Sequence, residues 1–312
     1  MRYRHGMETD ALRWFQLVAD GYTVTEVSDV YGVSQPGVSR ALARLEQEVG
    51  TPLLRRSGRV LRMTHAGAAF KRHVDSLVND LDDGLAAVDE LVDPEGGVVT
   101  LAYPLSLGSW LVPGLIRAFR KDHPRVRVVL QRTAVGETGR VSQLLATRRA
   151  DVELTAHRVT GADIEWRRIL VEPLVLAVPP THSLAGRQSV QLAEVADEPF
   201  VVRRPPSGMR TETLALCEAA GFVPHLAFEV DDLPTVRGLV SVGLGVAVVP
   251  AMGLHTPTTF ARTRLIPLTD QGAQREVGVA WVARRALLPS AESFRRFVLA
   301  GHPVAAGQAD PG

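Results

Sequence analysis

Residues 33–56 read VSQPGVSRALARLEQEVGTPLLRR, and this stretch decides how the chain begins to fold. Ser34 can cap a helix that carries Pro36 in its first turn, where the missing N–H is tolerated. Gly50, followed by Pro52, is suited to end this helix near Val49. Apolar residues recur along it every three or four positions, at Val38, Ala41, Leu42 and Leu45. The opposite face carries Gln35, Ser39, Arg40, Ala43 and Arg44.

A capping box precedes this stretch at Thr23-Val-Thr-Glu26. In such a motif the Thr hydroxyl accepts from the Glu N–H, and the Glu side chain reaches back to the Thr N–H. It predicts a short helix over residues 24–31, which should bury Val27 and Val30 and turn sharply at Gly32. An earlier helix is also predicted. Asp10 would cap it, and its apolar face would consist of Leu12, Phe15, Leu17 and Val18.

Two short helices joined by a glycine turn, with polar and basic groups on the outer face of the second, match what the major groove of DNA requires. The alternative is a small helical domain whose polar face is simply solvated. The residues LLRRSGRVLRMT at 53–64 indicate a β-hairpin around Ser57-Gly58. Its arginines would lie in reach of phosphates, which supply most of the binding affinity but little sequence information. They are Arg55, Arg56, Arg59 and Arg62.

The string at 33–56, followed by Thr64-His-Ala-Gly67, closely resembles the LysR-type transcriptional regulators. The usual pattern in that family is S-Q-P-A-V-S, then L-E, then G-x-x-L-F-x-R, then T-x-A-G. The chain departs from this pattern with Val27-Ser28 in place of two alanines, Gly37 in place of Ala and Leu54 in place of Phe. Gly37 should loosen the first turn of its helix by up to about 1 kcal/mol, which does not threaten the fold.

The resemblance implies a winged helix-turn-helix domain over residues 1–64 that binds double-stranded promoter DNA. Base edges in the major groove would be contacted by Gln35, Ser39 and Arg40. Phosphates would be contacted by Thr25, Ser34, Arg56 and Arg59.

Length and composition set the class of protein. With 312 residues, 46% of them hydrophobic and 22% charged, the chain should be an ordinary folded protein of two or three compact units. It has no apolar run of membrane-spanning length and no signal-peptide core in MRYRHGMETD, so a cytosolic location without a membrane partner is expected. The net charge of +1 conceals an asymmetry. Residues 1–72 carry +4 and residues 73–95 carry −8, which leaves +5 for the rest.

The acidic segment has the pattern of a long helix. From Thr64 to about Val92, apolar residues recur at steps of three and four, which predicts a helix with an apolar seam. The seam consists of Phe70, Val74, Leu77, Leu81, Leu85, Val88 and Leu91. Such a helix could lie on its own domain, but 23 residues with a charge of −8 need a solvated or cross-paired environment, so a helix that pairs with another is expected. In the LysR-type family a helix at this position forms the homodimer interface, and the dimers usually assemble into homotetramers. Residues 93–97 should form a hinge, so a linker over 65–96 is predicted.

From Val98 the pattern changes to short apolar runs that alternate with helical stretches, which is typical of βαβ units and a parallel sheet. Strands are expected at VVTLAY, VRVVLQRT, ADVELTA, LVLAVPP, FVVRR, HLAFEV, GVAVVP and EVGVAWVA. Residues 97–312 resemble the LysR-type effector domain at LVPGLIRAF, PPSGMR and GLVSVGLGVAVVP. The resemblance implies the α/β fold of periplasmic solute-binding proteins, in which two crossovers join two lobes around a cleft. The first lobe is expected at about 97–164 and 269–300, and the second at 165–268.

In open parallel sheets, ligands bind beyond the carboxyl ends of the strands, where helix N-termini present N–H groups. This rule selects as effector-binding residues Leu105, Ser106, Thr133, Arg203, Ser207 and Gly208, with Asp231 as a further candidate. Ser106 and Thr133 also fall where effector contacts commonly lie in the family. Each residue could equally be a helix cap or a loop residue. Arg203 and Arg204 favour an anionic effector such as a carboxylate, which arginine binds through two hydrogen bonds, and the alternative is a surface pair of arginines.

Sequence signatures of catalysis and of metal binding are absent. The chain has no G-x-S-x-G elbow, no Walker A loop, no H-E-x-x-H and no zinc spacing, and its nine histidines are scattered. The single Cys217 lies in an apolar pattern and should be buried. Gly243-Leu-Gly245 lacks the third glycine of a dinucleotide loop and precedes a strand, so it is interpreted as a helix-to-strand turn. No enzymatic activity, cofactor or metal is expected. The remaining alternative is a solute-binding or enzymatic α/β protein whose N-terminal helices serve only for dimerisation.

Overall fold

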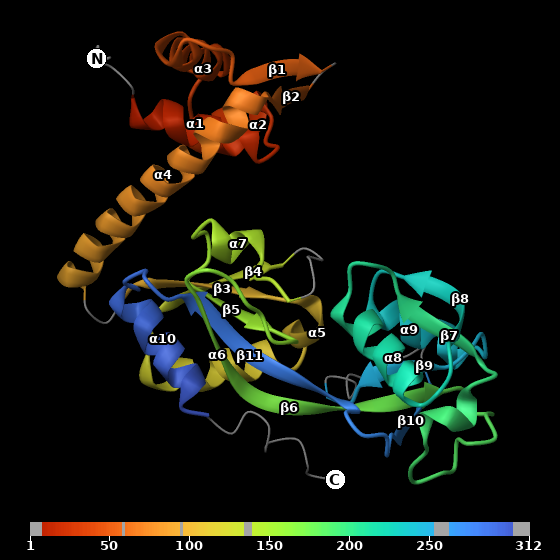
Figure 1. Ribbon diagram of the computed structural model, residues 1–312. Coiled ribbons are helices and arrows are strands. Elements are labelled where there is room, and N and C mark those ends of the chain that lie inside the picture. Colours follow the sequence, from red (N-terminus) through yellow and green to blue (C-terminus); the bar gives the residue numbers. More distant parts are fainter. Residues whose placement is uncertain (1–7, 58–59, 94–95, 134–138, 253–261, 302–312) are drawn as a thin grey trace. The chain divides into compact units, whose positions relative to one another are not determined.

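The computed structural model describes residues 8–57, 60–93, 96–133, 139–252 and 262–301 (Figure 1). Contacts divide the chain into two compact units, with the division between Asp89 and Glu90. The first unit combines helices with a β-hairpin, and the second is α/β. Each helix within the described residues is too short or too polar to cross a lipid bilayer.

The elements of the first unit begin and end close to where the sequence predicts them. They are α1 (Thr9–Ala19), α2 (Val24–Tyr31), α3 (Gln35–Val49), β1 (Leu54–Ser57), β2 (Val60–Met63) and α4 (His65–Val92). The predicted capping box is present, because Thr23 Oγ1 accepts from the Glu26 N–H at 3.2 Å and Glu26 Oε2 accepts from the Thr23 N–H at 2.7 Å. Ser34 caps α3, and Gly32 and Gly50 end α2 and α3 in the left-handed conformation, as predicted.

Two local predictions in this unit are wrong. The N-cap of α1 is Glu8, so Asp10 lies in the first turn of the helix and does not cap it. Val30 is 69% exposed, although Val27 is fully buried. The buried face of the short α2 is centred between Val27 and Ser28, and Val30 falls outside this face.

The first half of α4 completes the core of this unit. Val74 is buried there, and Phe70 contacts Phe15 with ring centroids 5.7 Å apart. The predicted seam is therefore wrong at its first two positions, since Phe70 and Val74 pack inside their own unit. Further along the helix the seam residues are exposed, namely Leu77, Leu81, Leu85, Val88 and Leu91.

The first lobe of the second unit is a sheet covered by helices. Its elements are β3 (Val98–Tyr103), α5 (Leu105–Gly108), α6 (Leu111–Asp122), β4 (Arg127–Arg132), α7 (Gln143–Ala146), β5 (Val152–Thr155), β11 (Gln274–Val282) and α10 (Pro289–Leu299). Strand β3 lies between β4 and β5 and is parallel to both, whereas β11 pairs with β5 in the antiparallel sense. The core is formed in part by the rings of Phe119, Phe294 and Phe297, which meet edge to face.

The second lobe has its own core. Its elements are η1 (Leu192–Val195), β7 (Pro199–Arg203), α8 (Gly208–Ala219), β8 (His225–Val230), α9 (Leu233–Ser241), β9 (Ala247–Pro250) and β10 (Arg264–Pro267). Strands β7 and β8 are parallel, and a bridge from Phe200 to Val246 joins β7 to the segment that enters β9. Cys217 is fully buried in this lobe, as predicted, and burial raises the pKa of its thiol to about 12.

Strand β6 (Ile164–Val178) runs through both lobes, as Figure 1 shows. It pairs with β11 up to Pro173, and from Leu174 onward it pairs with β9 and β10. The sequence predicts only the second part of β6, because residues 164–173 carry charged side chains and form no continuous apolar run. The connection between the lobes is thus made by this continuous strand and by the chain that returns from β10 into β11.

The Gly243-Leu-Gly245 segment is a helix-to-strand turn, as predicted. A substitution at Gly245 tests the geometry of this turn. A Cβ on Gly245 would lie 2.4 Å from the Pro199 carbonyl oxygen, and φ is +153° there. Gly238, inside α9, has no atom within 4 Å of its hypothetical Cβ. Gly245→Ala should therefore lower the free energy of unfolding by about 2 kcal/mol or more, whereas Gly238→Ala should raise it by up to about 1 kcal/mol. Urea unfolding measures both changes, and equal effects would contradict this turn geometry.

Candidate functional site

One candidate site is the outer face of α3 in the first unit. Gln35, Ser39 and Arg40 are exposed on this face. Arg44 is also exposed there, but its guanidinium pairs with Glu48 on the next turn at 3.1 Å. Gln35, Ser39 and Arg40 together present hydrogen-bond donors and acceptors to the solvent, which is what reading base edges requires.

Two of the predicted phosphate contacts lie at the N-terminal ends of α2 and α3. The Thr25 side chain is exposed in the first turn of α2. Ser34 Oγ accepts from the Gly37 N–H at 3.2 Å as the cap of α3, and its hydroxyl proton remains able to donate. A helix N-terminus attracts anions, because its first N–H groups have no partner within the helix and the helix dipole is positive there.

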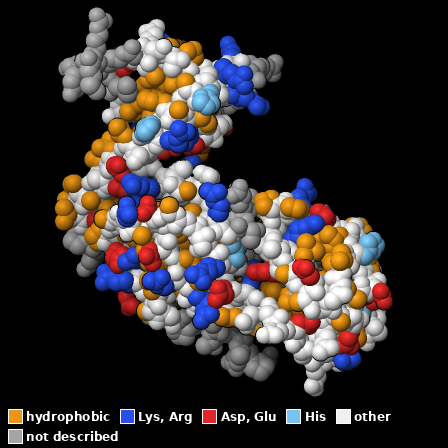
Figure 2. Space-filling model, in the orientation of Figure 1, with side chains coloured by type: hydrophobic (Ala, Val, Ile, Leu, Met, Phe, Trp, Pro, Cys, Tyr) orange, Lys and Arg blue, Asp and Glu red, His pale blue; other side chains and the backbone are white. Residues whose placement is uncertain are grey.

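The β1–β2 hairpin brings like charges opposite one another. Arg55 and Arg62 are directly paired across the two strands, and Arg56 is paired with Leu61 at the next position. Like charges at facing positions destabilise a hairpin, so an anion bound between them would be favoured. Figure 2 shows Lys and Arg side chains gathered at the hairpin end of the first unit. Arg59, the fourth arginine of the predicted hairpin, lies outside the described residues.

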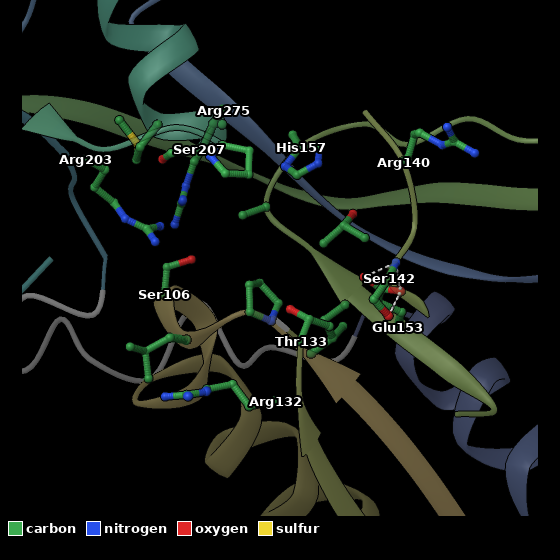
Figure 3. A pocket seen from close by; sticks show the side chains of 18 of the residues that line it. Ser106, Arg132, Thr133, Arg140, Ser142, Glu153, His157, Arg203, Ser207 and Arg275 are labelled. Carbon is green, nitrogen blue, oxygen red and sulfur yellow. Dashed lines mark hydrogen bonds between the residues drawn. The ribbon is translucent and has the colours of Figure 1, made fainter. Parts of the chain in front are cut away.

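A second candidate site is a cavity of about 300 Å³ between the two lobes of the second unit (Figure 3). It is surrounded by the carboxyl ends of β3, β4, β5 and β7 and by the first turn of α8. The structure brings all of the predicted effector residues to this cavity, together with Asp231: they are Leu105, Ser106, Thr133, Arg203, Ser207 and Gly208. The strand-end rule therefore selected residues that are far apart in the sequence and meet in space.

Of the two neighbouring arginines, Arg203 lines the cavity and Arg204 is exposed. Arg203 Nε and Nη2 donate to the Asp231 carbonyl oxygen at 3.1 and 2.7 Å, which fixes the direction of the guanidinium. Burial lowers the pKa of Arg203, and the nearby Arg275 adds to this, against the opposing charges of Asp231 and Asp232. Arg204 pairs with the Asp231 carboxylate at 2.6 Å. The interpretation as a surface arginine therefore holds for Arg204 and does not hold for Arg203.

Several residues of the cavity wall are not predicted from the sequence. Glu153 on β5 accepts from the Ser142 N–H at 2.9 Å and from its hydroxyl at 2.8 Å, and burial raises the pKa of this carboxyl. His157 has a buried Nε2 without a hydrogen-bond partner, and burial lowers its pKa. The strand-end rule would also have selected His157, which follows β5. It would not have found Glu153, because this residue lies inside the strand.

A buried ion pair lies on the two strands that connect the lobes. Arg275 of β11 faces Glu172 of β6 in the ladder, and the two residues are 4% and 0% exposed. Arg275 Nε donates to Glu172 Oε2 at 2.8 Å. Arg275 Nη2 forms an ion pair with the same oxygen at 2.7 Å but has no hydrogen-bond partner. Sequence reasoning missed this pair because each residue alone has the appearance of a surface charge.

The acidic residues of the cavity wall are already bound by protein groups. Asp232 Oδ1 accepts from the Thr235 N–H at 2.7 Å as the cap of α9, and Glu153 and Asp231 have the partners given above. Over the part of the chain that the structure describes, His, Cys, Asp and Glu do not gather in a group of three that could hold a metal ion. The wall therefore offers a ligand mainly hydroxyl, N–H and guanidinium groups.

Comparison with protein-family models gives two matches that together span most of the chain. Residues 9–68 match the bacterial regulatory helix-turn-helix protein, lysR family, and residues 93–303 match the LysR substrate binding domain. The transcriptional dual regulator GltC of Bacillus subtilis (strain 168) is 33% identical over 294 residues, covering 94% of this chain and 97% of its own length. The uncharacterized HTH-type transcriptional regulator YybE of the same strain is 31% identical over 293 residues, covering 94% of this chain and 98% of its own length.

Solved structures share the fold. Full-length CbnR, crystallised in complex with its target DNA, has a TM-score of 0.71 at 22% identity and covers 94% of this chain and 99% of its own. The effector binding domain of QuiR in complex with shikimate has a TM-score of 0.59 at 22% identity and covers 66% of this chain and 96% of its own.

Glu212 of α8 provides a test of the electrostatics near Arg275 and Glu172. Its Oε2 is buried without a hydrogen-bond partner, and burial raises the pKa of the carboxyl from 4.5 to about 7, against the opposing charge of Arg275. The folded protein thus holds this proton more tightly than the unfolded chain does, and it loses stability as the pH rises from 4.5 to about 7. Glu212→Gln should be nearly neutral at about pH 5 and raise the free energy of unfolding by about 1–3 kcal/mol at about pH 8.

Urea unfolding at the two pH values measures this difference. Glu218→Gln is the matched control, because Glu218 is exposed on the same helix. A gain for Glu212→Gln that is the same at both pH values would show that the buried carboxyl is not the source of the effect.

Proposed function

Because this chain belongs to the LysR family of bacterial transcriptional regulators, we propose that it binds double-stranded promoter DNA and that a small molecule held between its two lobes modulates this binding. The observation that carries the proposal is the presence, in one chain, of an exposed polar helix face beside an arginine-rich hairpin and of a cavity at the strand ends. The alternative of an enzyme with a helical dimerisation head is excluded, because the family consists of regulators and not of enzymes.

Helix α3 is the recognition helix in this proposal. Gln35, Ser39 and Arg40 contact base edges in the major groove. Phosphates are bound by Thr25, Ser34, Arg56 and Arg59, which orient the domain without reading the sequence. The facing Arg55 and Arg62 support this arrangement, because phosphates would relieve their repulsion. The structure of CbnR with its target DNA supports it further, since CbnR shares the fold.

The effector is bound in the cavity between the lobes. Its contacts in the proposal are Leu105, Ser106, Thr133, Arg203, Ser207 and Gly208. Arg203 favours an anionic effector. The QuiR effector binding domain, a structural neighbour in complex with shikimate, supports the binding of a small molecule by this fold. Effector binding changes the DNA-binding state if the effector binds one arrangement of the lobes more tightly than another.

The proposed organisation has three parts. They are a DNA-binding domain over 1–64, a linker helix with its hinge over 65–96, and an effector domain over 97–312. The sequence predicts its lobes at about 97–164 plus 269–300 and at 165–268, but residues 165–173 of β6 pair with β11 and belong to the first lobe. The exposed seam of α4 from Leu77 to Leu91 pairs with the same helix of a second copy, and the resulting homodimers assemble into homotetramers. Five exposed leucine and valine side chains on one helix support this pairing, because such a stripe is unfavourable in water.

Substitutions in α3 and in the hairpin should affect DNA binding differently. Gln35→Ala or Arg40→Ala should cost about 1–3 kcal/mol on the specific sequence and leave binding to scrambled DNA nearly unchanged. Arg56→Ala should weaken binding to both DNAs alike and reduce the salt slope by about 1. Fluorescence anisotropy with the DNA upstream of the protein's own gene and with scrambled DNA, at two salt concentrations, separates the two effects.

The control for these variants is Arg187→Ala, because Arg187 is exposed in the second unit. A uniform loss on both DNAs for all three variants would overturn the assignment of base and phosphate contacts.

The seam of α4 should determine the oligomeric state. Leu81→Asp/Leu85→Asp places two carboxylates in the proposed interface, where burial of charge is costly. We expect this variant to have a smaller mass than the tetrameric unmodified protein in size-exclusion chromatography with light scattering. Val223→Asp is the control, because Val223 is 91% exposed in the second lobe. An unchanged mass for the double variant would place the interface elsewhere.

A further inference from the structure

We propose that the anionic group of the effector binds between Arg203 and Arg275 at the N-terminus of α8, and that the effector is a small hydroxylated organic acid. This inference rests on the effector cavity proposed above. It adds Arg275, which comes from β11, one of the strands that connect the lobes.

Arg275 is a buried cation with an unused hydrogen-bond donor. Although it is only 4% exposed, it lines the cavity. Its Nε donates to Glu172 Oε2, and Nη2 is ion-paired with the same oxygen at 2.7 Å but has no hydrogen-bond partner. A buried N–H without a partner is unfavourable, more so on a charged group, so an acceptor supplied by a ligand is favoured. A carboxylate oxygen supplies the acceptor together with the opposite charge.

Other donors converge on the same part of the cavity. Figure 3 shows Arg203 and Arg275 pointing toward one another, and an anion between them would remove the repulsion that contributes to the lowered pKa of Arg203. Helix α8 has 12 residues and begins here with Ser207 and Gly208, so its first N–H groups and its dipole favour an anion at this point. His157, whose Nε2 is buried without a partner, lies beside Gly208.

The first-lobe side of the cavity is suited to hydroxyl groups of a ligand. Figure 3 shows Ser106 and Thr133 there, and each hydroxyl can donate and accept. Ser142 and Glu153 lie on the same side and bind one another. A volume of about 300 Å³ is at the lower end of the range for small-molecule sites. The cavity therefore fits a small metabolite with a carboxylate at the arginine end and hydroxyl groups at the other.

The position of Arg275 links the anion to the connection between the lobes. Glu172 on β6 accepts from Arg275 and, through Oε1, from the Met252 N–H at 2.9 Å. A ligand carboxylate bound to Nη2 shares the guanidinium with Glu172. Its binding changes the ion pair that joins β6 to β11, so the anion acts on the strands that set the arrangement of the lobes.

The ligand class is tested on the full-length protein with defined acids. Shikimate, quinate, malate and gluconate are the hydroxylated probes, benzoate and succinate lack hydroxyl groups, and the methyl ester of each acid is its uncharged analogue. Differential scanning fluorimetry at about 10 mM ligand identifies the acids that raise the Tm, and calorimetry gives their affinity. At least one hydroxylated acid should raise the Tm, and its methyl ester should not. If none of the four raises it, or if an ester binds as tightly as its acid, the proposed class is overturned.

The role of Arg275 is tested first with a double variant that leaves the net charge of the ion pair unchanged. Glu172→Gln/Arg275→Gln removes the cation without leaving Glu172 charged and unpaired, and it should weaken binding of the acid about 10- to 100-fold. Arg203→Gln should weaken it by a similar factor, and Arg275→Lys, which keeps the charge but loses the planar fork, by less. Arg204→Gln is the matched control with unchanged affinity, because Arg204 is exposed and does not line the cavity. Circular dichroism and the Tm without ligand verify that each variant folds.

The outcomes separate this inference from the function on which it rests. If both Arg275 variants bind the acid as tightly as the unmodified protein while Arg203→Gln and Thr133→Val weaken it, Arg275 is not an anion contact and the effector cavity stands. If none of these substitutions changes the affinity, the acid binds elsewhere and the cavity fails as the effector site.

Discussion

The antiparallel ladder between β6 and β11 is the constraint on which the second unit depends. The two lobes have separate hydrophobic cores, and β6 contributes Leu170 to one of them and Leu174 and Leu176 to the other. Between these two parts of the strand, Glu172 faces Arg275 with both side chains buried. A buried carboxylate that lost its cation would be strongly destabilising, so a slip in the register of this ladder is disfavoured. The ion pair therefore holds the strands in register at the junction of the lobes, beside the cavity.

The cavity follows from the direction of the strands that end at it. In both lobes a parallel strand delivers a polar residue at its carboxyl end, such as Thr133 after β4 and Arg203 at the end of β7. Successive residues of an extended chain point to opposite sides. This explains why Arg203 enters the cavity while Arg204 is exposed and pairs with the carboxylate of Asp231. Arg275 also lines the cavity, but it comes from β11 of the antiparallel ladder, whereas Arg203 comes from the end of the parallel strand β7.

Much of the acidic charge of α4 has a specific partner. Asp75 binds Lys71 at 2.6 Å and Asp82 binds Arg13, and both interactions are within the first unit. Glu90 belongs to the second unit, where its carboxylate accepts from the Ser290 N–H at 3.0 Å and from the Ser290 hydroxyl at 2.6 Å. A carboxylate at the N-terminus of α10 is stabilised by the dipole of that helix. These carboxylates therefore take part in packing, whereas the apolar seam from Leu77 to Leu91 is exposed.

The sequence by itself determined the features that depend on residues a few positions apart. The capping box at Thr23, the cap at Ser34 and the turn at Gly32 are local, and the strand ends that lead into the cavity follow from short apolar runs. The family motif added the domain order. Only the tertiary structure decided that residues 164–173 form a strand and that Glu172 meets Arg275, because both depend on pairing with a segment about a hundred residues away. It also decided that Val30 is exposed and that Phe70 and Val74 pack inside their own unit, since periodicity gives the face of a helix but not what covers it.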